Sequence, residues 1–308
     1  MESEFIAHLR SILPKSATDV LVGPGDDAAV LAWRKDRNCV VTTDMLMDGV
    51  DFRLGVDAPE RIGRKSLAVN LSDLAAMAAE PVGAVVSLAL PRAGGLELAK
   101  KLYAGLLPLA AQFKCPIIGG DTNSWDGPLV VSVTALGRTT DGRLLRRNGA
   151  KPGDAIVVTG EFGGSFLGKQ FDFTPRVRLA LDLAKCEEVH AAMDVSDGLS
   201  LDLSRMCAES GCGAVLRLDE IPIADAAHEL ARREPKSGSA LDHALSDGED
   251  FELILAIPLK EAERVVSNQG SDRLEIIGEF VAERGLWSVD SAGKRTLLAP
   301  RGYEHRMT

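Results

Sequence analysis

Apolar and polar residues follow two periods along this chain of 308 residues, one typical of helices and one typical of strands. In the first half, helical spacing predicts helices at residues 4–13, 59–79 and 96–113. Apolar runs and alternation predict strands at residues 39–43, 82–90, 116–118 and 129–136. Pro59 suits the first turn of the second helix, and Pro81 limits its end. Strands and helices alternate, which is typical of an α/β fold or of α+β layers.

A turn sequence, Lys151-Pro152-Gly153-Asp154, marks the best position for a domain boundary because a new strand follows it. Beyond it, the predicted helices are at residues 199–210, 225–233 and 259–267. The predicted strands are at residues 155–159, 214–218, 251–257, 274–280 and 286–289. The chain is therefore predicted to form two α/β domains, residues 1–150 and 151–308.

Composition excludes several classes of partner. Aromatic residues make up 5% of the chain and the formal net charge is −10, without a long Lys/Arg run, so nucleic-acid binding is not expected. The polar segment 1–10 is no signal peptide, and the apolar stretch 82–91 is too short to span a bilayer. The five cysteines are scattered without a CxxC pair, which favours buried thiols over disulfides. We expect a cytoplasmic protein.

Aspartates gather beside Gly, Ser or Thr where strands or turns end. The segments are Gly25-Asp26-Asp27, Thr42-Thr43-Asp44, Asn70-Leu71-Ser72-Asp73, Gly119-Gly120-Asp121-Thr122 and Asp194-Val195-Ser196-Asp197-Gly198. A single loop aspartate is usually a turn former or a helix cap. Five such segments instead indicate a cleft in which carboxylates bind Mg²⁺ together with substrate phosphates. An acidic protein needs such cations to bind a polyphosphate.

Other nucleotide-binding and catalytic motifs are either absent from the sequence or lack the sequence context that they require. Residues 163–169 match the GxxxxGK pattern of a P-loop, but Gln170 replaces the Ser/Thr that would bind Mg²⁺, and Pro175 interrupts the required helix. We interpret this segment as a Gly-rich turn that enters a short helix. The sequence contains no GxGxxG after a first strand, no GxSxG and no Cys/His cluster, and its five histidines are dispersed.

A set of motifs runs through the chain in a fixed order: GPGDDAAV, TTDML, KSLAVNLSDLAAM, IIGGDT, DVSDGLSLDL, SDGEDFELI, IIGEF and GYEH. This set, from Gly23 to His305, resembles the thiamine-monophosphate kinase family. NLSDLAAM and DVSDG are shared with the wider superfamily of aminoimidazole ribonucleotide synthetase and selenophosphate synthetase. GGDT with the closing GYEH points to the thiamine enzymes.

The resemblance implies a two-domain aminoimidazole ribonucleotide synthetase-like fold and transfer of the γ-phosphoryl group of ATP to thiamine monophosphate. It implies an N-terminal domain that binds ATP and metal and forms a homodimer, and a C-terminal domain that completes the site. Its metal residues would be Asp26, Asp27, Thr42, Thr43, Asp44, Asp73, Asp121, Asp194 and Asp197. Contacts with ATP would come from Gly120, Arg147, Ser196 and Tyr103. Asp197 and Arg147 are the catalytic candidates, and Glu249 and Tyr303 would hold the thiamine end.

Two positions depart from the family pattern. Asp51 stands where the family usually has a histidine that contacts substrate, and a carboxylate there would repel a phosphate unless a metal intervened. The segment 163–178 is also shorter than in the family, so one wall of the substrate pocket is expected to differ.

Two alternatives remain open. One is a related superfamily enzyme with a different acceptor, although selenophosphate synthetase would need a reactive N-terminal cysteine and the first one here is Cys39. The other is a non-catalytic protein that binds nucleotide or metal, which the complete acidic set disfavours.

Overall fold

A computed structural model describes residues 20–22, 29–32, 36–141, 143–186, 188–268, 270 and 272–305. The helix predicted at residues 4–13 lies outside this part of the chain, as do Asp26 and Asp27. Within the described part, no helix combines the length and the apolar composition needed to cross a membrane.

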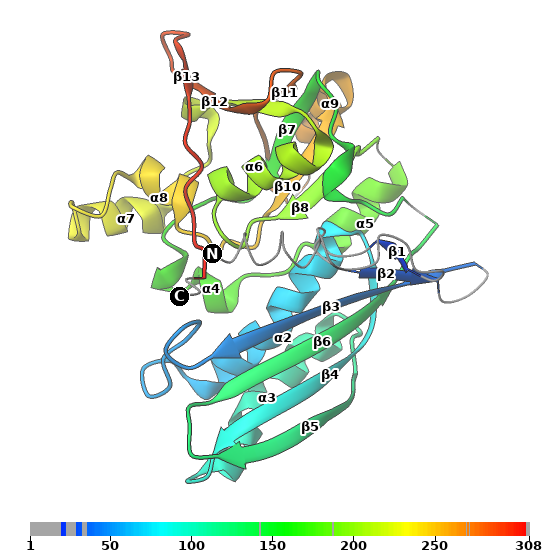
Figure 1. The fold of residues 1–308 in the computed structure, drawn as a ribbon, viewed down its shortest axis with the longest axis vertical. Helices are drawn as coiled ribbons and strands as arrows, with labels where there is room; N and C mark the ends of the chain where they lie inside the picture. The colour runs from blue at the N-terminus through cyan, green and yellow to red at the C-terminus, as the bar shows by residue number, and fades with distance from the viewer. Residues whose placement is uncertain are drawn as a thin grey trace.

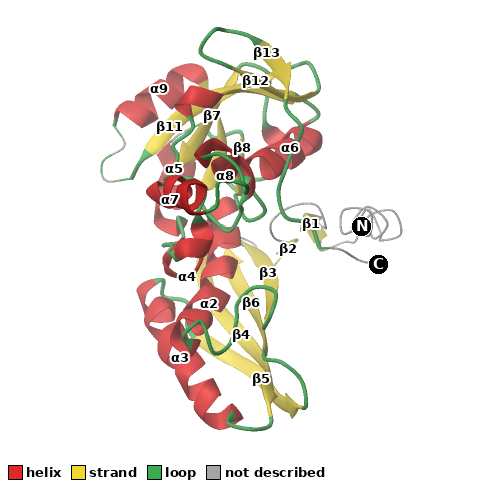
Figure 2. Ribbon diagram, turned by 90° about the vertical axis from the view of Figure 1, so that its left-hand side faces the viewer, coloured by secondary structure: helices red, strands yellow, loops and turns green. Residues whose placement is uncertain are grey.

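The first sheet has six strands in the order β1-β2-β3-β6-β4-β5. Its strands are β1 (Val20–Val22), β2 (Ala29–Ala32), β3 (Asn38–Met47), β4 (Glu80–Pro91), β5 (Ile117–Trp125) and β6 (Val130–Arg138). Strand β5 pairs in parallel with β4 because the helix α3 (Gly95–Gln112) connects them as a crossover. Helices α2 (Pro59–Ala76) and α3 lie together on one face of this sheet (Figure 2).

The second sheet has seven strands in the order β13-β12-β9-β11-β7-β10-β8. Its strands are β7 (Asp154–Thr159), β8 (Ala191–Asp194), β9 (Gly213–Arg217), β10 (Leu253–Pro258), β11 (Leu274–Val281), β12 (Gly285–Val289) and β13 (Arg295–Leu297). The helices of this half are α4 (Lys169–Asp172), α5 (Val177–Cys186), α6 (Leu199–Ser210), α7 (Asp225–Arg233), α8 (Ala240–Ser246) and α9 (Leu259–Ser267). After β13 the chain descends along α6 toward the first sheet (Figure 1).

Helix α2 contacts both halves of the molecule. It packs on α3, β3 and β6 in the first half and on α4, α5 and β8 in the second. Leu67, Leu71 and Leu74 are fully buried, in one hydrophobic core that also contains Leu253 and Leu255 of β10. The two sheets therefore share a core through α2, which places residues of this helix between them.

Helices α2 and α3 meet at two glycines. A Cβ atom on Gly63 would lie 1.9 Å from the carbonyl oxygen of Leu102, and one on Gly105 would lie 1.7 Å from that of Glu60. The two backbones are thus in direct contact where only glycine leaves room. Helix α2 ends at Ala76, three residues earlier than predicted, because Ala78 adopts a left-handed conformation with φ of 50°.

Most predicted elements are present with limits that differ by a few residues. The bounds of α6, α7 and α9 agree with the prediction, whereas β5 extends well beyond residues 116–118. Four elements of the second half were not predicted: α5, β8, α8 and β13.

Candidate active site

A cavity of about 330 Å³ lies between the two halves. Five carboxylate residues line it: Asp44, Asp51, Asp197, Asp247 and Glu249. No lysine or arginine is among the described residues that line it. A lining of this kind favours cations, or anions that reach it through metal ions.

Two hydroxyl–carboxylate pairs involve helix α2, one within the first half and one between the halves. Alternation along β3 turns Thr42 toward α2, where its Oγ1 donates a hydrogen bond to the carboxylate of Asp73. Ser72 Oγ, on the same helix, donates to Oδ2 of Asp194 at 2.6 Å. Asp194 is 2% exposed at the end of β8. The motifs around residues 42, 73 and 194 are therefore brought together by α2.

Asp197 lies just before α6 and is held by a buried partner. Asp202 is fully buried and accepts hydrogen bonds from the backbone N–H groups of Asp197 at 2.9 Å and Gly198 at 3.1 Å. Burial raises the pKa of Asp202 to about 7, the charge of Asp197 adds to this rise, and the guanidinium of Arg205 opposes it. Arg205 also forms an ion pair with Asp197, whose side chain is 28% exposed. Asp197 is therefore a carboxylate with a fixed backbone and an accessible head.

Asp121 and Thr43 lie apart from these pairs. Asp121 pairs in register with Ser87, Ser87 with Ser132 and Ser132 with Met45, so three strand spacings, about 14 Å, separate Asp121 from β3. This row belongs to the sheet face away from α2, where Thr43 Oγ1 lies 2.9 Å from Thr134 Oγ1. Gly120 precedes Asp121 on the edge strand β5 and is exposed. The structure therefore does not bring the GGDT motif to the cavity.

The oxygen-rich donor set suits Mg²⁺ only together with a phosphate ligand. Within the described residues, no three His, Cys, Asp or Glu side chains are grouped so as to hold one metal ion. Mg²⁺ is usually held by one or two carboxylates, waters and substrate phosphates rather than by an all-protein cage. The carboxylates of Asp44, Asp73 and Asp194 fit that role, and the hydroxyl groups of Thr42 and Ser72 beside them offer further oxygen atoms.

The residues expected at ATP lie in three environments. Ser196 lines the cavity. Arg147 belongs to the 3₁₀ helix η1 (Arg147–Gly149), which packs on α6, and its charge lowers the pKa of Asp202. Tyr103, on α3, is half-buried and packs against the hydrophobic core. Of these residues, Ser196 is the one that the structure places at the cavity.

The residues expected at the acceptor all line the cavity. Asp51 uses Oδ2 to accept the backbone N–H of Met47 at 2.7 Å, so one of its oxygens closes a turn. Tyr303 is held by its backbone N–H, which donates to the carbonyl of Asp197 at 2.9 Å. Its ring makes an edge contact with His305, with 5.0 Å between the centroids. Glu249 forms an ion pair with Lys65.

Sequence reasoning missed two residues next to this site. Lys65 lies within the NLSDLAAM helix and gave no signal of its own, because its partner is far away in sequence. Asp247 lies within SDGED and lines the cavity. Its Oδ2 accepts the N–H of Gly164 at 2.8 Å, and its Oδ1 lies 2.9 Å from His243 Nδ1.

A Ser–His–Asp chain ends at this aspartate, with His243 Nε2 3.0 Å from Ser237 Oγ. Ser237 Oγ also donates to the carbonyl oxygen of Glu234 at 2.6 Å, and a carbonyl cannot donate in return. The hydroxyl hydrogen of Ser237 is therefore used on this carbonyl and is not shared with His243. This arrangement orients Asp247 and gives Ser237 no base, so it is not that of a serine nucleophile.

The P-loop-like segment is a turn followed by the short helix α4. Lys169 Nζ donates to the carbonyl of Glu161 and lies 3.1 Å from Glu252 Oε1 and 3.6 Å from Asp250 Oδ1. Both carboxylates are buried, at 4% and 0% side-chain exposure. Lys169 therefore compensates buried negative charge inside the second half.

We expect Lys169→Met to leave the dissociation constant of ATP within about threefold of the parent, whereas loss of a P-loop lysine would weaken it by about two orders of magnitude. The melting temperature should fall, because Asp250 and Glu252 lose a cation in a buried setting. Calorimetric titration with ATP and a thermal melt measure the two effects. A hundredfold loss of affinity in a folded variant would show that this segment binds phosphate.

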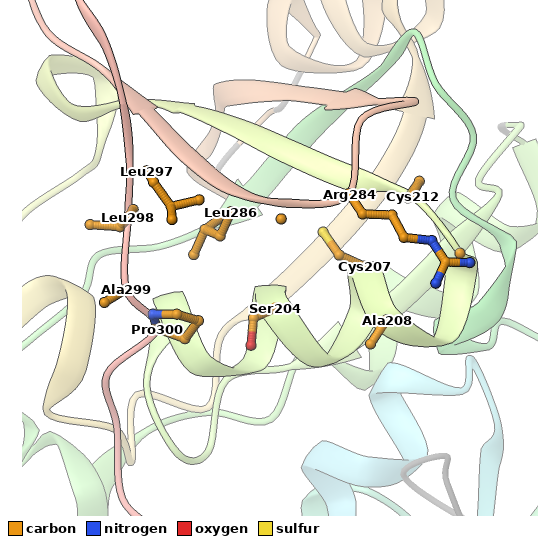
Figure 3. Close-up of a pocket in the computed structure, with 12 residues that line it drawn as sticks. Ser204, Cys207, Ala208, Cys212, Arg284, Leu286, Leu297, Leu298, Ala299 and Pro300 are labelled. Atoms are coloured by element: carbon orange, nitrogen blue, oxygen red, sulfur yellow. The ribbon is translucent and has the colours of Figure 1, made fainter.

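A larger cavity, of about 410 Å³, lies elsewhere in the second half. Helix α6 lines one side of it with Ser204, Cys207 and Ala208, and Leu286 and Leu297 line the other (Figure 3). Among the residues that the structure describes, no carboxylate lines this cavity. It therefore lacks the groups that a metal–nucleotide complex requires.

Comparison with known proteins identifies the family. Residues 25–139 match the family described as AIR synthase related protein, N-terminal domain, and residues 151–289 match its C-terminal domain. Thiamine-monophosphate kinase of Rhodopirellula baltica is 43% identical over 315 residues, covering 100% of this chain and 98% of the relative. The chain belongs to the thiamine-monophosphate kinase family.

Solved structures of the thiamine-monophosphate kinase family share this fold. The enzyme of Stenotrophomonas maltophilia K279a superposes with a TM-score of 0.72 at 35% identity, covering 92% of this chain and 94% of the other. AaThiL, complexed with AMPPCP and TMP, superposes with a TM-score of 0.83 at 24% identity, covering 98% and 96%. The predicted two-domain aminoimidazole ribonucleotide synthetase-like fold is confirmed.

Proposed function

We propose that this chain is a thiamine-monophosphate kinase, which transfers the γ-phosphoryl group of ATP in line to the phosphate of thiamine monophosphate and releases thiamine diphosphate and ADP. The observation that carries the proposal is the cavity lined by five carboxylates, with the aromatic ring of Tyr303 beside them. A thiazolium ring is cationic, and anionic and aromatic groups together suit such a ring. Membership of the thiamine-monophosphate kinase family also supports this reaction.

For this reaction the protein mainly has to align the phosphate donor with the acceptor. The acceptor is a phosphate oxygen that is already ionised near neutral pH, so the reaction needs no strong general base. The side chains of Ser196 and Tyr303 line the same cavity, where a phosphate donor and a ring-bearing acceptor can be aligned. Glu249 and Asp247 would face the cationic end of the acceptor.

Mg²⁺ belongs to the same proposal. Asp44, Asp73 and Asp194 would hold it together with the ATP phosphates, and Asp26, Asp27, Asp121 and Asp197 are further candidates. When bound, Mg²⁺ would neutralise the phosphate charge that the anionic cavity otherwise repels. Arg147 is proposed to add positive charge near the transferring group, although the cavity does not include it in this structure.

An assay with ATP and either thiamine monophosphate or thiamine tests the proposal. We expect thiamine diphosphate from the monophosphate and no product from thiamine, because the acceptor oxygen belongs to a phosphate. Addition of EDTA should abolish turnover and, in calorimetry, the binding of ATP. Undiminished ATP affinity in EDTA would contradict the metal bridge, and product from thiamine alone would contradict the acceptor.

The assembly and location are also proposals. Residues 1–150 are proposed to bind ATP and metal and to form a homodimer, and residues 151–308 to complete the active site. The first sheet presents a face without a described helix (Figure 2), and Met45 on β3 is 59% exposed there, which supports a second copy packing on it. Use of ATP as co-substrate supports a cytoplasmic location.

A further inference from the structure

Lys65 is a fully buried lysine with a complete set of acceptors. Its side chain has 0% exposure. Its Nζ donates to the carbonyl of Asp51 at 2.8 Å, to Oε1 of Gln170 at 2.9 Å and to the carboxylate of Glu249. An ammonium group has three donors, so all three are used. The partners come from three separate segments, which meet at this one nitrogen.

Glu249 is the partner that faces the cavity. One oxygen, Oε2, takes the ion pair, while the side chain keeps 21% of its surface exposed and lines the cavity of about 330 Å³. It also lines a neighbouring cavity of about 340 Å³ together with Gln170. The carboxylate therefore stands at a wall common to both spaces, and Lys65 fixes it from behind.

The backbone around Glu249 requires such support. Glu249 and Phe251 have φ values of 54° and 50°, a region that non-glycine residues rarely adopt. Their N–H groups donate to the carbonyls of Ser196 at 2.7 Å and Val195 at 2.8 Å, which holds the main chain. Strained backbone of this kind persists where the surroundings determine it, often at functional sites. Lys65 adds the side-chain restraint that these backbone bonds cannot give.

Electrostatics point the same way. Burial raises the pKa of Glu249, and the carboxylates of Asp51 and Asp197 add to this rise, whereas the ammonium of Lys65 lowers it. Without Lys65, this carboxylate would lose the cation that offsets its burial and the neighbouring negative charges.

We infer that Lys65 is a positioning residue for the acceptor: it holds the Glu249 carboxylate aimed at the cationic end of the substrate, and so sets affinity for the acceptor rather than for ATP. This inference rests on the proposed function. Lys65 is fully buried and does not line the cavity, so its effect passes through Glu249.

A double-mutant cycle tests it, with the variants Lys65→Met, Glu249→Gln and their combination. Each single variant should raise the KM for thiamine monophosphate about tenfold or more, because one member of a buried charge pair is lost in each. The KM for ATP and kcat should stay within about threefold of the parent. The KM of the double variant for thiamine monophosphate should be no higher than that of the single variants, because the two residues act as a unit.

Arg61→Met is the matched control. Arg61 lies on the same helix and forms an ion pair with Asp172 of the segment that also carries Gln170, but it does not contact Glu249. We expect its KM for thiamine monophosphate to equal that of the parent. A similar rise in Arg61→Met would assign the effect to the contact between helix and segment and would overturn the inference.

The remaining outcomes also decide the matter. An unchanged KM for thiamine monophosphate in folded Lys65→Met would overturn the inference and leave the proposed function intact. The same holds if the KM increases of the two single variants multiply in the double variant. A parent without thiamine-monophosphate kinase activity would overturn both. Lys65→Gln, which keeps a donor for Glu249, is the second variant if Lys65→Met does not fold. Failure of both to fold would assign Lys65 to the fold and overturn its positioning role.

Discussion

Asp73→Asn and Asp197→Asn are each expected to fold like the parent and to lose phosphoryl transfer by at least about a hundredfold, the scale seen when a charge-stabilising group is removed. Asparagine keeps one oxygen that can accept the hydrogen bond of Thr42 at position 73. At position 197 the ion pair with Arg205 is lost, but Arg205 keeps Asp202 as a partner at 2.9 Å. The stability should therefore change little, whereas the negative charge that would bind the metal ion of the metal–phosphate complex is lost.

Turnover at saturating Mg²⁺ and a thermal melt measure the two effects separately. Asp290→Asn is the matched control, because Asp290 caps the turn between β12 and β13 and accepts the N–H groups of Ala292 at 3.0 Å and Lys294 at 2.9 Å. It should keep parent turnover. If Asp73→Asn and Asp197→Asn also kept parent turnover, both aspartates would be structural residues.

Gly63→Ala and Gly105→Ala are expected to destabilise the protein by at least about 3 kcal/mol, at the upper end of the range for overpacking. Helix propensity alone would favour alanine by about 1 kcal/mol. The added Cβ atoms would lie 1.9 Å and 1.7 Å from carbonyl oxygens of the facing helix, and backbone cannot rotate out of the way as a side chain can. The clash therefore outweighs the propensity, and α2 and α3 must separate.

Urea unfolding measures this loss. Gly119→Ala is the control, since its Cβ would lie 3.7 Å from the side chain of Val85, an ordinary contact. We expect its free energy of unfolding to stay close to that of the parent. Equal losses in all three variants would argue against a specific contact between the helices.

Local signals accounted for much of the fold. Pro59 marked the start of α2, and the apolar spacing of α6 and α9 gave their bounds. Strand β8 was missed because its sequence, Ala191 to Asp194, is short and mostly small, so that its burial depends on pairing with β10. Helix α8 has only seven residues, and its start depends on a capping box between Ser239 and Asp242.

The site was predictable in its residue types but less so in its geometry. The sequence motifs identified the acidic segments of the site. In the structure, Thr42 is hydrogen-bonded to Asp73 and Ser72 to Asp194. Strand order and register, which no local pattern contains, place Asp121 on the edge strand and on the other face of the sheet. The pairing of Lys65 with Glu249 was hidden for a similar reason, because the two residues lie in different halves of the chain.

The cavity walls also constrain the order of folding. Asp44 belongs to an early strand, whereas Tyr303 and His305 come from the far end of the described chain. Contacts between such distant segments form late, because a long loop must close before they can be made. A partly folded chain therefore has no complete cavity, and it cannot align ATP with an acceptor until both sheets have formed around α2.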